Sequence, residues 1–316
     1  MNANVTAVPG HPHSEAAEIH EQRELGFWLY LMGDAIIFAL LLILAAPLAA
    51  ASQAPYQGPL IDAHSHLPNP QVLEAYVAAM KRHNVGKVVL LGVGGVQKQD
   101  VEWIAAAAKR HPDRVIQGAP VPDPLGQGQA SKLDALLGSG QYRAAGEVHV
   151  RQESRKIDRR ADDPAFGQVL EVAAKHGVPV VIHCELTAAA SSLEPALQKH
   201  PKAVIVLAHG GSAEPAMLEG LLGRNPNLLV DLSGMHYQRT PRLASEKGPL
   251  DPAWKALIEK FPDRFLMGID VWAPRLFEPA TLDRLLAWTR RILGELPPEV
   301  AQKVAYRNAA RLFRVE

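Results

Sequence analysis

The sequence predicts an α/β fold, a (β/α)8 TIM barrel of parallel strands preceded by one N-terminal hydrophobic helix. Three observations predict it. From residue 60 onward, eight short runs rich in β-branched residues alternate with stretches of helical period. Histidine or aspartate recurs where several of these runs end. Residues 55–316 leave about 260 residues for the barrel domain, near the ~250 typical of this fold. A doubly wound open sheet is the alternative architecture.

The predicted strands are short apolar runs, and the predicted helices lie between them. The strands cover residues 59–64, 87–91, 115–119, 144–148, 178–183, 203–208, 228–231 and 265–269. The helices cover residues 71–83, 98–111, 129–137, 164–176, 192–200, 214–223, 251–261 and 279–293. Asn84 and Gly177 stand just beyond two of these helices, and asparagine and glycine readily end a helix. Eight alternations without a tandem sequence repeat favour a closed barrel.

Composition predicts a globular domain with a small-molecule partner. The 316 residues are 47% hydrophobic and carry 33 basic and 33 acidic side chains, so no charge excess indicates a nucleic-acid partner. The single cysteine, Cys184, excludes an intramolecular disulfide. Because side chains alternate along a strand, Cys184 is expected to face away from whatever His183 faces. The oligomeric state stays open, a homo-oligomer included.

The N-terminal segment differs in kind from the rest of the chain. Residues 1–24 are polar, which predicts a disordered tail. Residues 25–51 carry Asp34 as their only charge and end in small residues, so we expect a transmembrane anchor or a cleaved secretory signal. A buried soluble helix is the alternative. Arg23 precedes this segment and no Lys or Arg follows until Lys81, which predicts a barrel domain outside the cytoplasm, membrane-anchored or secreted to the periplasm.

Five candidate metal ligands stand at the ends of predicted strands. They are His64 and His66 in Leu60-Ile-Asp-Ala-His-Ser-His, His183 in Val180-Val-Ile-His, His209 in Val204-Ile-Val-Leu-Ala-His and Asp270 in Phe265-Leu-Met-Gly-Ile-Asp. In a parallel barrel, the carboxyl ends of all strands meet at one face. His64 and His66 are two residues apart on an extended strand, so both side chains face the same way. Imidazoles together with a carboxylate suit a divalent transition metal, and we expect one or two Zn²⁺ ions.

The run Leu60-Ile-Asp-Ala-His-Ser-His-Leu and the closing Asn308-Ala-Ala-Arg-Leu-Phe resemble the amidohydrolase superfamily of metal-dependent TIM-barrel hydrolases, especially its amidohydrolase-related branch. The resemblance covers residues 58–313. It implies that His64 and His66 are the ligands of the first strand. It further implies ligands on three later strands: His183 on the fifth, His209 on the sixth and Asp270 on the eighth.

Glu147, in Ala144-Ala-Gly-Glu-Val-His, falls where some members of that superfamily place a bridging carboxylate or a carboxylated lysine. Many amidohydrolase-related members bind one ion and have no acid there, so Glu147 indicates a two-ion site. The resemblance then implies two sets of ligands: His64, His66 and Asp270 on one ion, and His183 and His209 on the other. The alternative is that Glu147 forms an ion pair with Arg143 or Arg151.

The ligands suggest the chemistry. A divalent ion lowers the pKa of a bound water to about 7 and polarises a carbonyl group. Asp270 is expected to take the proton from that water and return it to the leaving group, and His209 to bind the second ion or steer the water. Candidate substrate contacts lie just beyond strand ends: His149, Arg151, His236, Tyr237 and Trp272.

The sequence therefore predicts a metal-dependent hydrolase of an amide, lactone or ester. A non-oxidative decarboxylase is the first alternative, because the amidohydrolase-related branch includes such enzymes with the same ligands. The second alternative is a non-catalytic protein of a membrane-bound respiratory complex, because residues 20–44 resemble the start of subunit III of cytochrome o ubiquinol oxidase. Nothing after residue 44 continues that pattern of spans, so the oxidase role itself is not expected.

Overall fold

The computed structural model describes residues 20, 23–37, 54–93 and 99–315. The chain divides into two compact units, Met1–Gln53 and Ala54–Glu316. In the first unit, residues 23–37 are helical. Most of the predicted tail 1–24 and the later part of the predicted segment 25–51 lie outside the described residues. In the described part of the chain, no helix has both the length and the apolar character needed to span a membrane.

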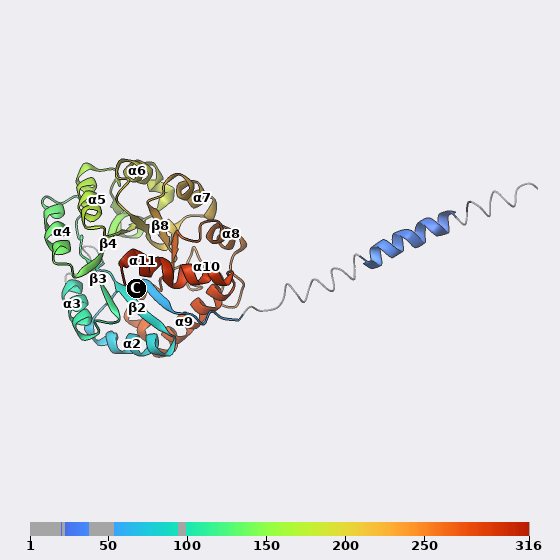
Figure 1. The fold of residues 1–316 in the computed structure, drawn as a ribbon, viewed down its shortest axis with the longest axis horizontal. Helices are drawn as coiled ribbons and strands as arrows, with labels where there is room; N and C mark the ends of the chain where they lie inside the picture. Colours follow the sequence, from blue (N-terminus) through green and yellow to red (C-terminus); the bar gives the residue numbers. More distant parts are fainter. Residues whose placement is uncertain (1–19, 21–22, 38–53, 94–98, 316) are drawn as a thin grey trace, which may run out of the picture. The chain divides into compact units, whose positions relative to one another are not determined.

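The second unit is built on eight parallel strands that neighbour one another in sequence order (Figure 1). These strands are β1 (Leu60–Ser65), β2 (Val85–Leu90), β3 (Val115–Ala119), β4 (Tyr142–Gln152), β6 (Val180–Cys184), β7 (Ile205–Leu207), β8 (Leu228–Asp231) and β9 (Phe265–Leu266). A further strand, β5 (Ile157–Asp158), pairs antiparallel with the end of β4 and lies off this path.

Backbone hydrogen bonds bring the two ends of the sheet together. The Ala63 amide donates to the Met267 carbonyl at 2.9 Å, and the Asp270 amide donates to the His64 carbonyl at 2.8 Å. The sheet is therefore a nearly closed barrel, which confirms the predicted (β/α)8 architecture. The open sheet that the sequence left as an alternative is excluded, because its first and last strands would not meet.

Helices follow the strands and form a ring outside the barrel (Figure 1). They are α2 (Leu73–Arg82), α3 (Asp100–Arg110), α4 (Gln129–Gly138), α5 (Pro164–His176), α6 (Leu186–Lys199), α7 (Pro215–Arg224), α8 (Pro252–Lys260) and α9 (Pro279–Gly294). Short 3-10 segments are η1 (Pro70–Val72), η2 (Glu153–Arg155), η3 (Ala208–Ser212) and η4 (Pro274–Phe277). The last described elements are α10 (Pro298–Gln302), the π-helical η5 (Lys303–Arg307) and α11 (Asn308–Phe313).

The capping residues explain why the outer helices begin and end where they do. At the start of α5, the Asp163 side chain accepts a hydrogen bond from the Ala165 amide at 2.8 Å, and Pro164 occupies the first helical position. Gly177 ends α5 in the left-handed region at φ 62°. The next strand, β6, starts three residues later. Short connections of this kind hold each helix against the strands on either side.

Alternate strand side chains face two different cores. Ile61, Val89 and Val181 face the barrel interior, where Phe313 of α11 joins them. Side chains one residue away, such as Leu60, pack outward against the helices. Phe313 also lies beside the first residues of β4 and the residues just before β6, so α11 covers the amino-terminal end of the barrel. The carboxyl-terminal end is left for a functional site.

Apart from shifts of a few residues at the ends of strands and helices, the main differences from the sequence prediction are the following. Strand β4 continues to Gln152 and folds back through η2 into β5, a hairpin that the sequence did not indicate. Helix α6 begins at Leu186, earlier than predicted, because the chain turns into the helix directly after Cys184 and Glu185. Residues 298–313 are helical, whereas no helix was predicted there.

Candidate metal centre

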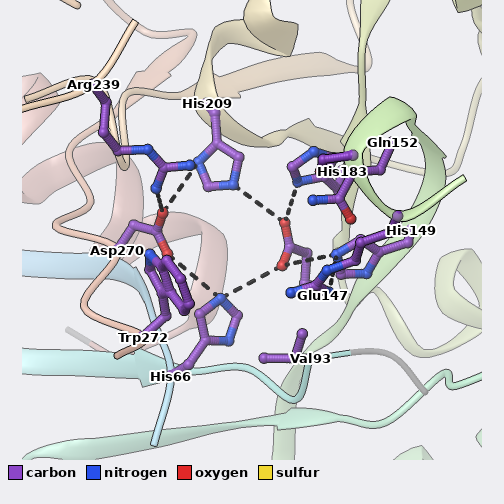
Figure 2. Close-up of a pocket in the computed structure, with 12 residues that line it drawn as sticks. His66, Val93, Glu147, His149, Gln152, His183, His209, Arg239, Asp270 and Trp272 are labelled. Atoms are coloured by element: carbon purple, nitrogen blue, oxygen red, sulfur yellow. Dashed lines mark hydrogen bonds and ion pairs between the residues drawn. The ribbon is translucent and has the colours of Figure 1, made fainter. Parts of the chain in front are cut away.

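The six side chains predicted as metal ligands converge at the carboxyl-terminal end of the barrel, most of them in view in Figure 2. They come from different elements: His64 from β1, His66 from just after β1, Glu147 from β4, His183 from β6, His209 from η3 and Asp270 from just after β9. Within three groups of three residues, the ligand atoms lie within 4.8 Å of one another: His64, His66 and Glu147; His64, His209 and Asp270; and Glu147, His149 and His183.

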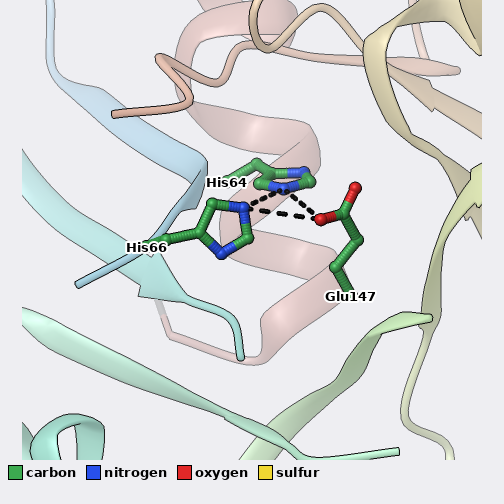
Figure 3. A group of neighbouring side chains, drawn as sticks. All are labelled: His64, His66 and Glu147. Carbon is green, nitrogen blue, oxygen red and sulfur yellow. Dashed lines mark hydrogen bonds and ion pairs between the residues drawn. The ribbon is translucent and has the colours of Figure 1, made fainter. Parts of the chain in front are cut away.

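Nε2 of His64 and Nε2 of His66 face each other (Figure 3). Nδ1 of His66 donates to the Leu91 carbonyl at 2.8 Å, and Nδ1 of His64 donates to the Asp231 carboxylate at 2.9 Å. In a neutral ring the proton is then on Nδ1, so both Nε2 atoms carry lone pairs, and they lie 3.2 Å apart. Two lone pairs at this distance repel each other unless a proton or a metal ion lies between them.

Asp231, the last residue of β8, positions two of the ligands. One carboxylate oxygen accepts from His64, and the other accepts from the His209 amide at 3.2 Å and the Ser233 amide at 3.0 Å. Its side chain is fully buried. A carboxylate that fixes the tautomer of a ligating histidine is a common companion of metal sites. Asp231 was not among the predicted site residues, although it ends a predicted strand as the ligands do.

Glu147 lies at the middle of the cluster. Its Oε2 is 3.8 Å from Nε2 of His64 and 3.5 Å from Nε2 of His66. Its Oε1 is 3.1 Å from Nδ1 of His183 and 3.3 Å from Nε2 of His209. The carboxylate thus faces one histidine pair with each oxygen.

The alternative partners of Glu147 lie elsewhere. The guanidinium of Arg143 donates to the Gly140 carbonyl at 2.7 Å, and that of Arg151 pairs with Asp158 at 3.8 Å. Gly146 lets β4 approach β6 closely at this point, because a Cβ on it would collide with the Val181 carbonyl oxygen. The backbone next to Glu147 therefore requires glycine.

His209 also presents Nε2 to the centre. It lies in the left-handed region at φ 57°, and its Nδ1 is 2.9 Å from the Ser233 carbonyl, which can only accept. The proton of the neutral ring is therefore on Nδ1, and Nε2 faces Glu147 as a lone pair. This is the same arrangement as at His64 and His66.

Asp270 divides its carboxylate between the cluster and an arginine. Oδ1 lies 3.6 Å from Nε2 of His66, and Oδ2 accepts from the Arg239 guanidinium at 2.5 Å (Figure 2). Arg239 comes from the long loop after β8, and no sequence motif indicated this pair. The arginine leaves one oxygen of Asp270 facing the centre.

The electrostatics of the cluster favour a cation. Burial alone would lower the pKa of His64, but Asp231 and Glu147 outweigh it and raise that pKa well above its ordinary value. Burial alone would also lower the pKa of His209, but Asp270 and Glu147 outweigh it and raise that pKa. For Glu147, burial would raise the pKa, yet His64, His183 and His209 hold it well below its ordinary value. Carboxylates that draw protons onto buried imidazoles would attract a metal ion in the same way.

The donor set fits a divalent metal. Imidazole nitrogens and carboxylate oxygens are ligands of zinc, manganese and similar ions, and the inward lone pairs need a cation to relieve their repulsion. The outer nitrogens of His64, His66 and His209 are already held by Asp231 and by carbonyl groups, as ligating histidines usually are.

A pocket of about 260 Å³ opens above the cluster. Besides the ligands, it is lined by Val93, His149, Gln152, Ser154, Arg155, Arg239 and Trp272. Of the predicted substrate contacts, His149 and Trp272 therefore lie at the pocket. Arg151, His236 and Tyr237 are absent from this lining, and Tyr237 packs against Trp288 with ring centroids 6.0 Å apart.

His149 stacks on His183, with ring centroids 5.1 Å apart and planes 13° apart. Burial lowers the pKa of His149 to about 4, so the ring is neutral at physiological pH. Its Nε2 lies 3.8 Å from Glu147 and 3.3 Å from the Arg155 guanidinium, and its buried Nδ1 has no hydrogen-bond partner in the described part of the chain. His149 thus lies between the cluster and the rim of the pocket.

A family model described as Amidohydrolase matches residues 50–315. No curated protein sequence matches the chain. The chain is similar to the 2,6-dihydroxybenzoate decarboxylase from Rhizobium, with 16% identity, a TM-score of 0.56, and coverage of 81% of this chain and 99% of that one. It is also similar to the 4-oxalomesaconate hydratase from Rhodopseudomonas palustris, with 15% identity, a TM-score of 0.58, and coverage of 81% and 96%.

A third similar structure is the 5-carboxyvanillate decarboxylase from Novosphingobium aromaticivorans, which was solved with manganese. It has 14% identity, a TM-score of 0.54, and coverage of 84% of this chain and 100% of that one. At such identities, the likeness to the three structures shows the fold.

Proposed function

This chain belongs to the amidohydrolase family, and from that premise we propose that it is a metal-dependent enzyme that releases carbon dioxide from a small carboxylic acid. The observation that carries the proposal is the inward set of imidazole nitrogens and carboxylates beneath a pocket of about 260 Å³. Two of the similar structures are named as decarboxylases, which favours decarboxylation over the hydrolysis that the sequence put first. The manganese in one of them makes manganese as suitable a candidate as zinc.

The proposed ion would be held by His64 and His66, with the Glu147 carboxylate beside them. Such an ion would bind oxygen atoms of the substrate and withdraw electron density from the carbon that bears the carboxylate. Asp231 and the Leu91 carbonyl keep the two imidazoles in the ligating tautomer. These contacts hold the centre in place before substrate arrives.

Asp270 is the proposed proton carrier. When the bond to the carboxyl carbon breaks, its electron pair stays on the substrate carbon, and that carbon takes a proton as carbon dioxide leaves. Oδ1 of Asp270 faces the centre, and a proton that it takes up from water before the bond breaks can pass to that carbon, because Oδ2 is occupied by Arg239. The ion pair with Arg239 thereby fixes which oxygen reacts.

Hydrolysis of an amide, lactone or ester is the second candidate, and Glu147 favours it. This carboxylate lies between the His64–His66 pair and the His183–His209 pair, with an oxygen toward each. The arrangement suits two ions bridged by Glu147, and paired ions occur in several classes of hydrolase. Asp270 would then accept a proton from water instead of donating one to carbon.

The third function that the sequence left open, a non-catalytic membrane protein, gains no support from residues 50–315, which match an enzyme family. The anchor or signal in residues 25–51 and a location outside the cytoplasm stay predictions of the sequence.

The experiment that separates the candidates measures two products from the same protein. Full-length protein loaded with Mn²⁺ or Zn²⁺ would be incubated with hydroxybenzoates and other carboxylated aromatics, and with amides, esters and lactones. Carbon dioxide release that is lost in His64→Ala supports decarboxylation. Release of a new acid without carbon dioxide supports hydrolysis instead, and the absence of both over the panel contradicts the proposal.

A further inference from the structure

The hairpin formed by β4, η2 and β5 builds one wall of the pocket. Strand β5 folds back on β4 through the pairs Arg151–Asp158 and Gln152–Ile157. Residues of β4 and η2 that line the pocket are Glu147, His149, Gln152, Ser154 and Arg155. Because β4 also carries Glu147, the rim of the pocket and the centre are joined by one continuous strand.

A register shift explains which side chains of the hairpin face inward. His149 pairs with His183, but Arg151 pairs with Cys184, so β4 has one extra residue between these pairs. An extra residue of this kind reverses the alternation of side chains. Arg151 therefore lies on the side of Cys184, away from the pocket, and Gln152 faces in. This is why Arg151, which simple alternation would place beside His149, is not at the pocket.

Arg155 lines the pocket, and its guanidinium has no carboxylate partner among the described residues. The neighbouring arginines each have one within 4 Å: Arg151 has Asp158, Arg159 has Asp123, Arg160 has Asp162 and Arg239 has Asp270. Among the residues that the structure describes, no acidic side chain pairs with Arg155. Its contact is with Nε2 of His149, at 3.3 Å.

Polar atoms beside Arg155 also lack partners. Oε1 of Gln152 and Nδ1 of His149 are buried and make no hydrogen bond in the described part of the chain. Buried polar groups are nearly always hydrogen-bonded, so groups left open at a pocket indicate a ligand that completes them. Because Nε2 of His149 accepts from Arg155, the proton of the neutral ring is on Nδ1. The same wall therefore has an unneutralised guanidinium and an unsatisfied imidazole N–H donor, both of which suit an acceptor such as a carboxylate, whereas the Gln152 oxygen would need a donor.

We propose that Arg155 binds a carboxylate of the substrate that is separate from the group that reacts. His149 lies 3.8 Å from Glu147 on one side and 3.3 Å from Arg155 on the other, so Arg155 is one imidazole ring farther from the centre. A planar guanidinium matches a carboxylate with two parallel hydrogen bonds. The substrate class is a small molecule with an acidic group at the Arg155 end and its reacting group at the Asp270 end. This inference rests on the proposed metal-dependent function.

The test compares an acid that has two carboxylates with an acid that has one. Isothermal titration of Mn²⁺-loaded full-length protein would measure the affinity for isophthalate, which has two carboxylates, and for benzoate, which has one. We expect the wild type to prefer isophthalate by roughly 10- to 100-fold, as for one charge-assisted hydrogen-bonded pair. Arg155→Gln should abolish this preference and leave benzoate binding and manganese content unchanged, whereas Arg155→Lys should retain part of it.

Arg160→Gln is the matched control, because Arg160 is exposed and already paired with Asp162 at 2.7 Å. It should bind both acids as the wild type does. An Arg155→Gln variant that keeps the full preference would overturn the assignment, and so would a metal-loaded wild type with no preference for isophthalate. A wild type that shows the preference but converts no substrate would instead contradict the proposed function and leave the role of Arg155 standing.

Discussion

Asp231 and His64 form a buried carboxylate–imidazole pair, with Nδ1 of His64 2.9 Å from the Asp231 carboxylate and both side chains fully buried. The pair directs Nε2 of His64 toward the other ligands. Through its second oxygen, Asp231 also accepts from the backbone amide of His209. Asp231, which is outside the donor set, therefore orients two ligands. Its removal should lower the affinity for metal.

Asp231→Asn is expected to weaken divalent metal binding by about 10- to 100-fold, because the neutral amide no longer favours the ligating tautomer of His64. Competition with a fluorescent chelator measures the affinity of each variant for Mn²⁺ and Zn²⁺. Asp134→Asn is the control, since Asp134 pairs with Lys175 away from the centre. Unchanged affinity in a folded Asp231→Asn protein would show that the pair does not support the centre.

If the centre holds two ions, as the hydrolytic candidate requires, Glu147→Gln should reduce the metal content of the fully loaded protein from two ions to one. An amide cannot bridge two cations as a carboxylate does, and the charge that neutralises them is lost. Elemental analysis after dialysis gives the stoichiometry directly. Glu171→Gln, a change at an exposed residue of α5, serves as the control. If the wild type holds only one ion, the centre is mononuclear and Glu147 is a nearby carboxylate.

Metal affinity should rise with pH. The raised pKa values of His64 and His209 mean that the metal-free protein carries protons on these rings at pH values where a free imidazole would lose them. An incoming ion must displace those protons, so lowering the pH from about 8 to 6 should weaken binding. Titrations at several pH values, with proton release measured in buffers of different ionisation enthalpy, check this. An affinity independent of pH over that range would contradict the assigned protonation.

The eight strands and six donors could be predicted from the sequence because each depends on a few consecutive residues. A β-branched run marks the strand, and a polar residue at its end marks the cavity. Asp231 obeys the same rule and was missed only because it acts through His64. Arg239 could not be predicted, because its contact with Asp270 depends on the path of a long loop. Arg155 was missed for a third reason: it lies in η2, within the β4–β5 hairpin that no sequence signal indicated.

Cys184 is expected to be inert in the folded protein despite following a proposed ligand. It is 1% exposed, and burial raises the pKa of its thiol to about 12, with Glu185 adding to the shift. A thiol with such a pKa has almost no thiolate at neutral pH. Ellman's reagent should find no reactive thiol in the native protein and one after denaturation in guanidinium. Rapid reaction of the native protein would contradict this prediction, because it would mean that Cys184 at the end of β6 becomes accessible to the reagent.

Removal of residues 1–53 should leave a folded and metal-binding barrel. The compact unit Ala54–Glu316 contains every barrel strand and all six donors. A second truncation, starting at residue 60, tests where the barrel begins. The buried Arg290 side chain donates to the carbonyls of Tyr56 at 2.7 Å and Gly58 at 3.0 Å, and the second truncation removes both acceptors.

Nη1 of Arg290 then lacks both acceptors, whereas Nε and Nη2 keep the carbonyls of His83 and Asn84. A buried donor without an acceptor costs about 1–3 kcal/mol, which corresponds to a melting temperature at least about 2 °C lower for a domain of this size. Differential scanning calorimetry and metal titration of the two truncated proteins measure the effect. The protein starting at residue 54 should bind metal like the full chain and melt above the protein starting at residue 60. Loss of folding or of metal binding already in the longer of the two proteins would show that residues 1–53 support the barrel, and that the anchor and the enzyme are not separable.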